Sequence, residues 1–227
     1  MMYPFFYDPS MVFLIPALIF AMWAQWKVQS TFARYSTRPS NSGRTAEDVA
    51  YQILLEHGIQ NVVIEHTPGQ LTDHYDPRNR VLRLSDATYG SDSIAAIGVA
   101  AHEAGHAVQH ARGFVPLIMR NAIYPVAAFS SYMAFPLFFL GFLMGLPMLI
   151  NLGIYLFAGT VAFHLVTLPV EIDASRRAVV ALRQGYMDER EIRGVKAVLS
   201  AAALTYIAAT LMAIMQLLRL LWLRDRE

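Results

Sequence analysis

Three long stretches of the chain carry no charged side chain and consist mainly of apolar residues. These stretches are Pro9–Trp26, Asn121–Val170 and Val198–Leu218. Because a helix needs about 20 residues to cross the roughly 30 Å apolar core of a bilayer, the first and last stretches each predict one membrane span. The middle stretch would be about 75 Å long as a single helix. It therefore predicts two spans joined by a turn near Gly145–Pro147, where helix-breaking residues cluster.

Between the first two apolar stretches, the residue pattern predicts a small soluble region that contains two helices. Thr45 is expected to be the N-cap of a helix that ends at Gly58, because threonine side chains cap helix starts and glycine favours helix ends. Ser91 or Asp92 is expected to cap a second helix, which ends at Gly113.

The segment between these helices is rich in β-branched and turn-forming residues. Asn61–His66 predicts a strand because it is rich in β-branched residues. Leu71–Tyr75 and Arg80–Ser85 lie on either side of Asp76–Asn79, a turn-like cluster, and predict a β-hairpin.

Composition narrows the class of protein. Charged residues make up 15% of the chain, against about 25% in ordinary soluble domains, and outside the three apolar stretches their density returns to about that value. The net charge of +1 gives no field that would recruit nucleic acid. The chain has no cysteine, which excludes disulfides, thiolate zinc sites and cysteine nucleophiles. A hydrophobic content of 56% excludes disorder.

The second predicted helix carries the motif His102-Glu103-Ala104-Gly105-His106. Two histidines four residues apart share one helical face and can bind one zinc ion. Glu103 lies beside that ion, where it can take a proton from zinc-bound water. Small residues such as Gly98 and Gly105 suit a metal and a substrate that lie close to the helix.

A catalytic zinc site needs a third protein ligand and one open position. His110 shares the face of His106 but lies one further turn away, about 6 Å along the helix axis, which disfavours it. Glu171 follows the predicted pair of spans, and a carboxylate at the end of a span is costly unless it is paired or bound to a metal. We therefore expect Glu171 to be the third ligand, with an ion pair to Arg176 or Arg177 as the alternative.

Three blocks of sequence resemble the YugP-like family of membrane zinc metallopeptidases, distant kin of HtpX and the CAAX prenyl proteases among the gluzincins. They are LTDHYDPRNRVLRLS at 71–85, GVAAHEAGHAVQHA at 98–111 and LPVEIDASRRA at 168–178. The resemblance extends over nearly the whole chain. It implies a cofactor of one Zn²⁺ per chain, held by His102, His106 and Glu171, with Glu103 as the catalytic base.

The resemblance also implies that the 71–85 hairpin supplies an edge strand on which an extended peptide substrate lies. The chain departs from the wider gluzincin pattern at one position. There, an aspartate four residues after the ligand glutamate commonly braces a zinc-binding histidine, whereas this chain has Ser175. Asp173 is two residues after Glu171 and would point to a different face of a helix.

Further polar residues are candidates for supporting the metal ligands or contacting the substrate. His110 and Asp173 could support the ligands. His74 or Tyr75 could stabilise the oxyanion, although each could simply face the cleft or solvent. Arg177 could bind a substrate carbonyl or carboxylate, or anchor the end of the span.

These observations predict a mainly α membrane protein with about four transmembrane helices and a small α+β zincin-like catalytic part. The expected function is that of a membrane-embedded zinc endopeptidase. Its expected partners are a protein or peptide substrate, membrane proteins among the options, and the lipid bilayer. The alternative is a non-catalytic membrane protein with a structural or transport metal site. An intramembrane protease of the site-2 type is disfavoured, because the uncharged run before His102 is too short for a crossing.

The distribution of Lys and Arg predicts the orientation of the chain. Nine of the 18 lie in residues 27–120 and six in residues 171–197, so both segments are expected to face the cytoplasm of a multi-pass protein of the cell membrane. Residues 1–10 contain none, so the first span is expected to be a retained anchor rather than a signal peptide. This orientation does not explain Arg219, Arg224 and Arg226, because four spans would place the C-terminal tail outside the cell. They would fit if the last stretch were tilted or only partly inserted.

The same reasoning divides the chain into five parts. They are an N-terminal anchor (1–28), a catalytic part with the HExxH helix (29–116), a transmembrane hairpin (117–170), a third-ligand segment (171–197), and a C-terminal transmembrane helix and tail (198–227).

Overall fold

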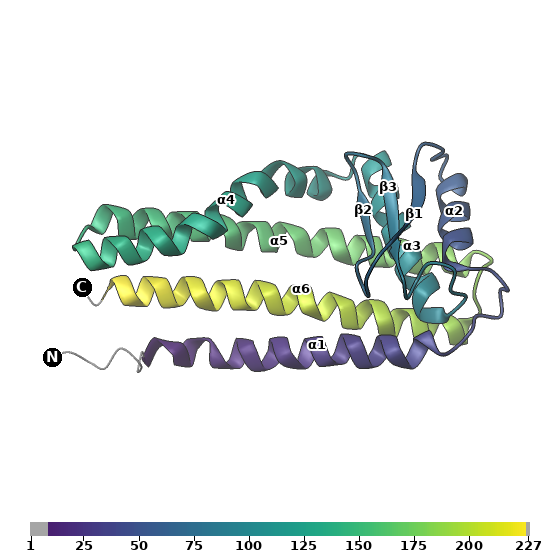
Figure 1. The fold of residues 1–227 in the computed structure, drawn as a ribbon, viewed down its shortest axis with the longest axis horizontal. Coiled ribbons are helices and arrows are strands. Elements are labelled where there is room, and N and C mark those ends of the chain that lie inside the picture. Colours follow the sequence, from purple (N-terminus) through teal and green to yellow (C-terminus); the bar gives the residue numbers. More distant parts are fainter. Residues whose placement is uncertain (1–8, 226–227) are drawn as a thin grey trace. The chain divides into compact units, whose positions relative to one another are not determined.

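The computed structural model describes residues 9–225, and it divides into two compact units (Figure 1). We call them the span unit (Met1–Gln25, Met119–Leu168 and Thr205–Glu227) and the sheet unit (Trp26–Ile118 and Pro169–Leu204). The elements, in chain order, are η1 Pro9–Phe13, α1 Ile15–Ser36, α2 Ala46–Glu56, β1 Val63–Thr67, β2 His74–Asp76, β3 Val81–Ser85, α3 Ile94–Ala111, α4 Val115–Met144, α5 Pro147–Arg183 and α6 Glu189–Arg224.

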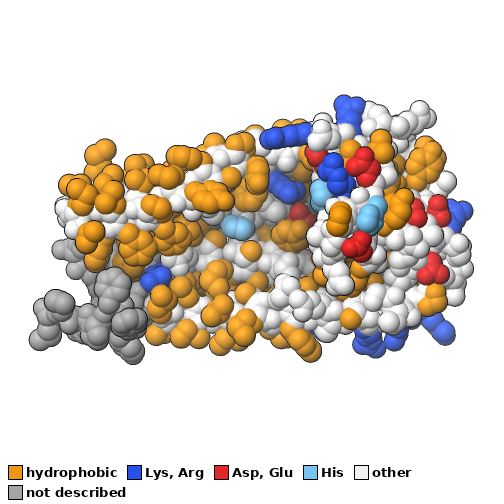
Figure 2. All heavy atoms as spheres, in the orientation of Figure 1, with side chains coloured by type: hydrophobic (Ala, Val, Ile, Leu, Met, Phe, Trp, Pro, Cys, Tyr) orange, Lys and Arg blue, Asp and Glu red, His pale blue; other side chains and the backbone are white. Residues whose placement is uncertain are grey.

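The predicted fold class is confirmed. Among the described residues, four helical segments are long and apolar enough to cross a membrane: Ser10–Ser36, Val115–Met144, Pro147–Arg183 and Glu189–Arg224. These helices are longer than the charge-free stretches, because α1, α5 and α6 continue as helices through neighbouring charged residues. On the face drawn in Figure 2, hydrophobic side chains cover the helices of the span unit, and charged side chains gather over the sheet unit.

Within the span unit, α4 and α5 form the predicted hairpin. The turn lies at Gly145, whose φ of 61° is the left-handed conformation that glycine adopts easily. A Cβ atom on Gly153 would lie 2.7 Å from the carbonyl oxygen of Ala134, so the two helices approach to a distance that only glycine permits. Phe138 and Ile150 are buried in the core of this hairpin.

Two of the three C-terminal arginines have partners among the described residues. Arg219 Nε donates to Ser10 Oγ at 2.9 Å, and Arg224 pairs with the carboxylate of the next residue at 2.8 Å. Arg226, like residues 1–8 of the predicted anchor, lies outside the described residues. The side of the membrane on which these arginines lie stays a prediction.

The helices of the sheet unit begin and end close to the predicted positions. Thr45 caps α2 through a capping box with Asp48, and the helix ends before Gly58, whose φ is 73°. The N-cap of α3 is Ser93, whose side chain accepts from Ala96 N at 3.2 Å. The expectation of Ser91 or Asp92 was therefore wrong by one or two residues.

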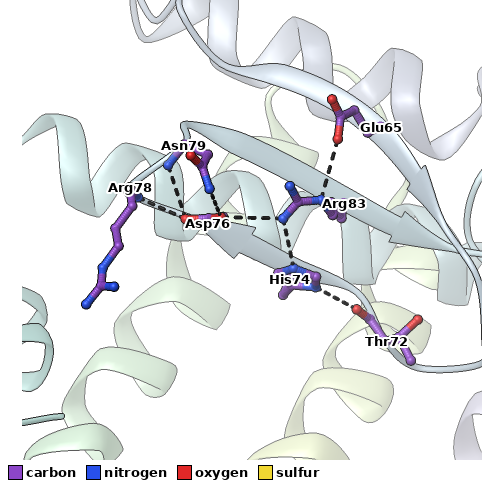
Figure 3. Close-up of polar contacts among 7 residues, drawn as sticks. All are labelled: Glu65, Thr72, His74, Asp76, Arg78, Asn79 and Arg83. Carbon is purple, nitrogen blue, oxygen red and sulfur yellow. Dashed lines mark hydrogen bonds and ion pairs between the residues drawn. The ribbon is translucent and has the colours of Figure 1, made fainter. Parts of the chain in front are cut away.

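The sheet has the strand order β1-β3-β2, with β1 parallel and β2 antiparallel to β3. The predicted hairpin is thus β2–β3, but β2 begins only at His74. Leu71 has a φ of 56°, which interrupts an extended strand, and the Asp73 carboxylate accepts from Ser85 N at 2.8 Å in place of a backbone carbonyl. The turn is held by Asp76, whose carboxylate accepts from the backbone of Arg78 (Figure 3).

Two small residues of α3, Gly98 and Gly105, pack closely against neighbouring helices. That they also make room for a metal and a substrate stays a prediction. A Cβ on Gly105 would lie 2.8 Å from the carbonyl oxygen of Ala174 in α5. A Cβ on Gly98 would lie 3.2 Å from Val195 Cγ1 in α6. Gly105 therefore lets α3 and α5 approach closely enough for short side chains to meet.

Candidate metal centre

The structure brings together the three residues expected to bind the metal. His102 and His106 come from α3, one turn apart, and Glu171 comes from α5. Their nearest ligand atoms all lie within 4.8 Å of one another. Glu171 Oε2 lies 3.3 Å from His102 Nε2 and 3.6 Å from His106 Nε2. Glu171 is 3% exposed and His106 is 8% exposed, so the cluster is shielded from solvent.

These separations suit a zinc ion. Ligand atoms bonded to a tetrahedral zinc at about 2.0–2.1 Å are roughly 3.3–3.4 Å apart, which is close to the distances from Glu171 to the two imidazoles. Burial lowers the pKa of His106, but the close carboxylate of Glu171 and the charge of Glu103 together raise that pKa above the ordinary value. The surroundings of His106 thus favour positive charge, which a divalent cation supplies.

The carboxylate of Glu103 is the group left for acid–base chemistry. Glu103 is 8% exposed and lies on α3 between the two histidines in sequence. Among residues 9–225, no side chain or backbone group hydrogen-bonds to its carboxylate. The carboxylate is therefore available to a water molecule beside the three ligands.

Gln109 holds His106 in the orientation that metal binding needs. The fully buried Gln109 side chain donates through Nε2 to the carbonyl oxygen of Val170 at 2.8 Å and to Asp173 Oδ2 at 2.9 Å. Both partners accept hydrogen bonds, so the amide oxygen must face His106 Nδ1, 3.0 Å away. A neutral His106 is thereby protonated on Nδ1, which leaves the Nε2 lone pair for a metal.

Asp173 and Arg177 extend this chain of contacts. Arg177 Nε donates to Asp173 Oδ2 at 2.6 Å, and its guanidinium lies 5.7 Å from the ring centre of Phe114. Arg177 therefore neutralises the carboxylate that supports Gln109, and it pairs with Asp173 rather than with Glu171, the partner in the alternative reading of Glu171. A contact of Arg177 with a substrate stays a prediction. The sequence reasoning identified Asp173 as a candidate support but missed Gln109. Its signal was its position seven residues after His102, on the same face of the helix.

His102 has a simpler support. Its Nδ1 lies 3.1 Å from Ser175 Oγ, and no other hydrogen bond to this nitrogen is formed within residues 9–225. Ser175 occupies the position where the wider gluzincin pattern has an aspartate. A hydroxyl can accept from Nδ1 as a carboxylate does, but it adds no negative charge.

One turn beyond His106, α3 contacts the sheet through His110, which meets Tyr75 of β2. Tyr75 Oη lies 2.9 Å from His110 Nδ1, and burial raises the pKa of Tyr75. This pair lines a cavity of about 360 Å³ together with Arg80 and Asn61. The structure does not bring His110 into the ligand cluster, in agreement with its expected exclusion.

His74 is engaged within the sheet. Figure 3 shows its ring between Arg83 and Thr72, with His74 Nε2 3.3 Å from Arg83 Nη1 and His74 Nδ1 2.8 Å from the carbonyl oxygen of Thr72. Arg83 also approaches Glu65 and Asp76, each at 3.5 Å. His74 thus belongs to a surface network on β2 and β3, and Tyr75 is the residue of the two that points toward α3.

Comparisons with known proteins agree with this geometry. The family described as "Putative neutral zinc metallopeptidase" matches residues 10–225. A relative from Bacillus subtilis (strain 168), described as "Putative membrane protease YugP", is 48% identical over 216 residues, which cover 94% of this chain and 96% of the relative. No solved structure matches the chain.

Proposed function

The chain belongs to this family of neutral zinc metallopeptidases, and we propose that it is a membrane zinc endopeptidase with its catalytic centre in the sheet unit. The observation that carries the proposal is the meeting of His102, His106 and Glu171 beside the unengaged carboxylate of Glu103. A purely structural zinc site fills four positions with protein ligands. Here three candidate ligands meet, and the fourth position is left for water or substrate.

In this proposal, the two histidines and Glu171 hold one zinc ion. Zinc, when bound there, supplies a Lewis acid that makes a water molecule more acidic and polarises a carbonyl group. Glu103 accepts the proton of the attacking water and passes it to the departing amine of the cleaved peptide bond. Gln109 and Ser175 keep both imidazoles oriented during these steps, through the contacts to their Nδ1 atoms.

The arrangement of the sheet supports an extended peptide as substrate. β2 is at one end of the strand order, so within the described residues one of its edges pairs with no other strand. β2 also supplies Tyr75, which reaches α3 next to His110. A peptide that adds to this edge would form backbone hydrogen bonds independent of its sequence, and its side chains would be selected by the neighbouring surface.

Replacement of Glu103 by Gln tests the mechanism. We expect the E103Q variant to bind one zinc per chain, as the parent does, and to lose cleavage of a quenched-fluorescent peptide library by at least about 10²-fold, the lower end of what general acid–base catalysis contributes. Zinc is measured by elemental analysis of the purified full chain. The matched control is Glu65→Gln, an exposed carboxylate on β1, which should keep full activity. Undiminished cleavage by E103Q would refute the proposed role of Glu103.

We further propose that the catalytic centre faces the cytoplasm. The argument is the concentration of Lys and Arg in residues 27–120 and 171–197. Because the chain has no cysteine, an Arg78→Cys variant carries a single thiol in the β2–β3 turn. A membrane-impermeant thiol reagent should label this variant in opened cells only. Labelling in intact cells would reverse the orientation.

A further inference from the structure

A groove of about 500 Å³ lies between α5 and α6 within the sheet unit, separate from the cavity beside Tyr75. Its lining combines two kinds of side chain. Arg176, Arg183 and Lys196 supply positive charge, whereas the apolar wall is formed by Ile172, Val179, Val180, Leu199 and Ala203. No Asp or Glu is part of the lining. The groove therefore has a positively charged part and an apolar part.

Two of the three basic side chains that line the groove form no ion pair among the described residues. Arg183 pairs with Glu189 at 2.9 Å, but Arg176 and Lys196 form no ion pair within the part of the chain that the structure describes. Both are exposed. Arg177, next to Arg176 in sequence, is neutralised by Asp173 and does not line the groove. The two unpaired charges, one from α5 and one from α6, thus both lie in this groove.

Two apolar side chains that line the groove are also exposed to solvent. Ile172 is 57% exposed and Val180 is 47% exposed, although both line the groove. In sequence, the groove begins where the charge-free stretch Asn121–Val170 ends, and it continues into the stretch Val198–Leu218. It therefore lies where two candidate spans pass from apolar to charged sequence, as expected at the level of lipid headgroups.

We propose that this groove binds an anionic phospholipid, with the phosphate on Arg176 and Lys196 and an acyl chain along Ile172, which lies on the side of the charge-free stretch. Basic pockets between transmembrane helices take anionic headgroups in this way. A soluble anion would leave the apolar wall exposed, and a zwitterionic lipid would bring its own cationic group close to Arg176 and Lys196. The groove also reaches the metal centre, because Ser175 is part of its lining and contacts His102 Nδ1 at 3.1 Å.

The test uses the purified full chain in a non-ionic detergent, with no peptide substrate, so its outcome is independent of the proposed peptidase activity. Binding of phosphatidylglycerol and phosphatidylcholine is compared by native mass spectrometry. We expect phosphatidylglycerol to bind about tenfold more tightly, since each cation near a headgroup contributes to the attraction. Equal binding of the two lipids would overturn the proposal.

Two double variants separate the groove from general surface charge. Arg176→Gln with Lys196→Gln should abolish the preference for phosphatidylglycerol. Arg190→Gln with Arg193→Gln removes the same charge from exposed positions of α6 outside the groove and should leave it intact. Equal losses in both would overturn the assignment. Zinc content equal to that of the parent identifies variants that remain folded.

A third variant, Ile172→Gln, tests the acyl-chain contact and keeps all cations. It should weaken phosphatidylglycerol binding several-fold, whereas unchanged binding would overturn the lipid assignment. Inorganic phosphate and glycerol phosphate are added as competitors to the parent protein. If either displaces phosphatidylglycerol at equal concentration, the groove recognises a free phosphate and the proposal is wrong.

Discussion

Helix α3 presents one face to α5 and another to the sheet, and the polar groups on these two faces are held differently. Toward α5, His106, Gln109 and Asp173 form a continuous chain of hydrogen bonds that ends at Arg177. Toward the sheet, the pair Tyr75–His110 borders a cavity of about 360 Å³. A metal site needs donor atoms that are held in fixed positions, whereas a substrate that binds and dissociates needs open space. Under the proposed function, the groups between α3 and α5 therefore suit metal binding, and the cavity beside Tyr75 suits a substrate.

Removal of Glu171 is expected to have the largest effect on this comparison. Glu171→Ala deletes the one candidate ligand from α5 and leaves the buried His106 and the half-buried His102 without this carboxylate. We expect zinc affinity to fall by more than the roughly 10–100-fold that is typical for residues that only support ligands. Competition with a chromophoric chelator measures it. The control, Glu189→Ala, removes an exposed carboxylate from α6 and should bind zinc as the parent does. Unchanged zinc affinity in Glu171→Ala would exclude Glu171 as a ligand.

Replacement of Gln109 tests the rigidity of the α5 face without touching a ligand. Gln109→Ala should weaken zinc binding by about 10–100-fold, because His106 Nδ1 loses its acceptor and Asp173 loses a donor. Ser175→Ala should have a smaller effect, within about tenfold, because a water molecule can replace the hydroxyl at this half-buried position. The same chelator titration compares the two. A larger loss for Ser175→Ala would reverse the relative importance of the two supports.

Tyr75→Phe tests the sheet face. The substitution deletes the hydroxyl that contacts His110 Nδ1, so we expect the free energy of unfolding to fall by about 1 kcal/mol, the typical net value of one hydrogen bond. Zinc affinity should stay within about twofold of the parent, since the residues that support metal ligands typically contribute more. Thermal unfolding in detergent and the chelator titration measure the two quantities. A loss of zinc affinity as large as that of Gln109→Ala would show that the two faces are not independent.

The smallest expected effect concerns the turn between β2 and β3. The side-chain hydrogen bond from Asn79, followed by backbone donors, lowers the pKa of Asp76 from 3.8 to about 2. Because the folded pKa lies below the unfolded one, the stabilisation is complete above pH 4 and is lost as the pH falls from about 4 through 2. Asp76 is near the surface, so we expect only a few tenths of a kcal/mol.

The measurement compares parent and Asp76→Asn by thermal unfolding in the presence of a chelator, so that acid release of zinc does not contribute. The difference between the two proteins should shrink as the pH is lowered from 5 to 2. A difference that is independent of pH would contradict the assigned pKa.

Local signals in the sequence predicted much of the sheet unit. Thr45 and Gly58 delimit α2 because capping and left-handed glycine act over a few residues, and the β2–β3 hairpin follows from its turn residues. The parallel pairing of β1 with β3 was not predicted, because it depends on the path of the intervening chain.

Contacts between helices were harder to predict than the ligands themselves. The HExxH spacing specifies two ligands on one helix, and Glu171 was inferred from the cost of a carboxylate at the end of a span. The partners of the imidazoles depend on how closely α3 and α5 pack, which Gly105 and Ala174 determine through their backbones. The sequence therefore indicated that Ser175 departs from the wider pattern, but not that its hydroxyl reaches His102.

The α4–α5 hairpin divides the ligand set in the order of synthesis. His102, Glu103 and His106 precede it in the chain, and Glu171 follows most of it. A growing chain that stops before residue 171 contains only two of the three ligands, whatever it has already folded. Under the proposed function, the peptidase can become active only after α4 and the part of α5 up to Glu171 have been made, and chains released before that residue by interrupted translation remain inactive.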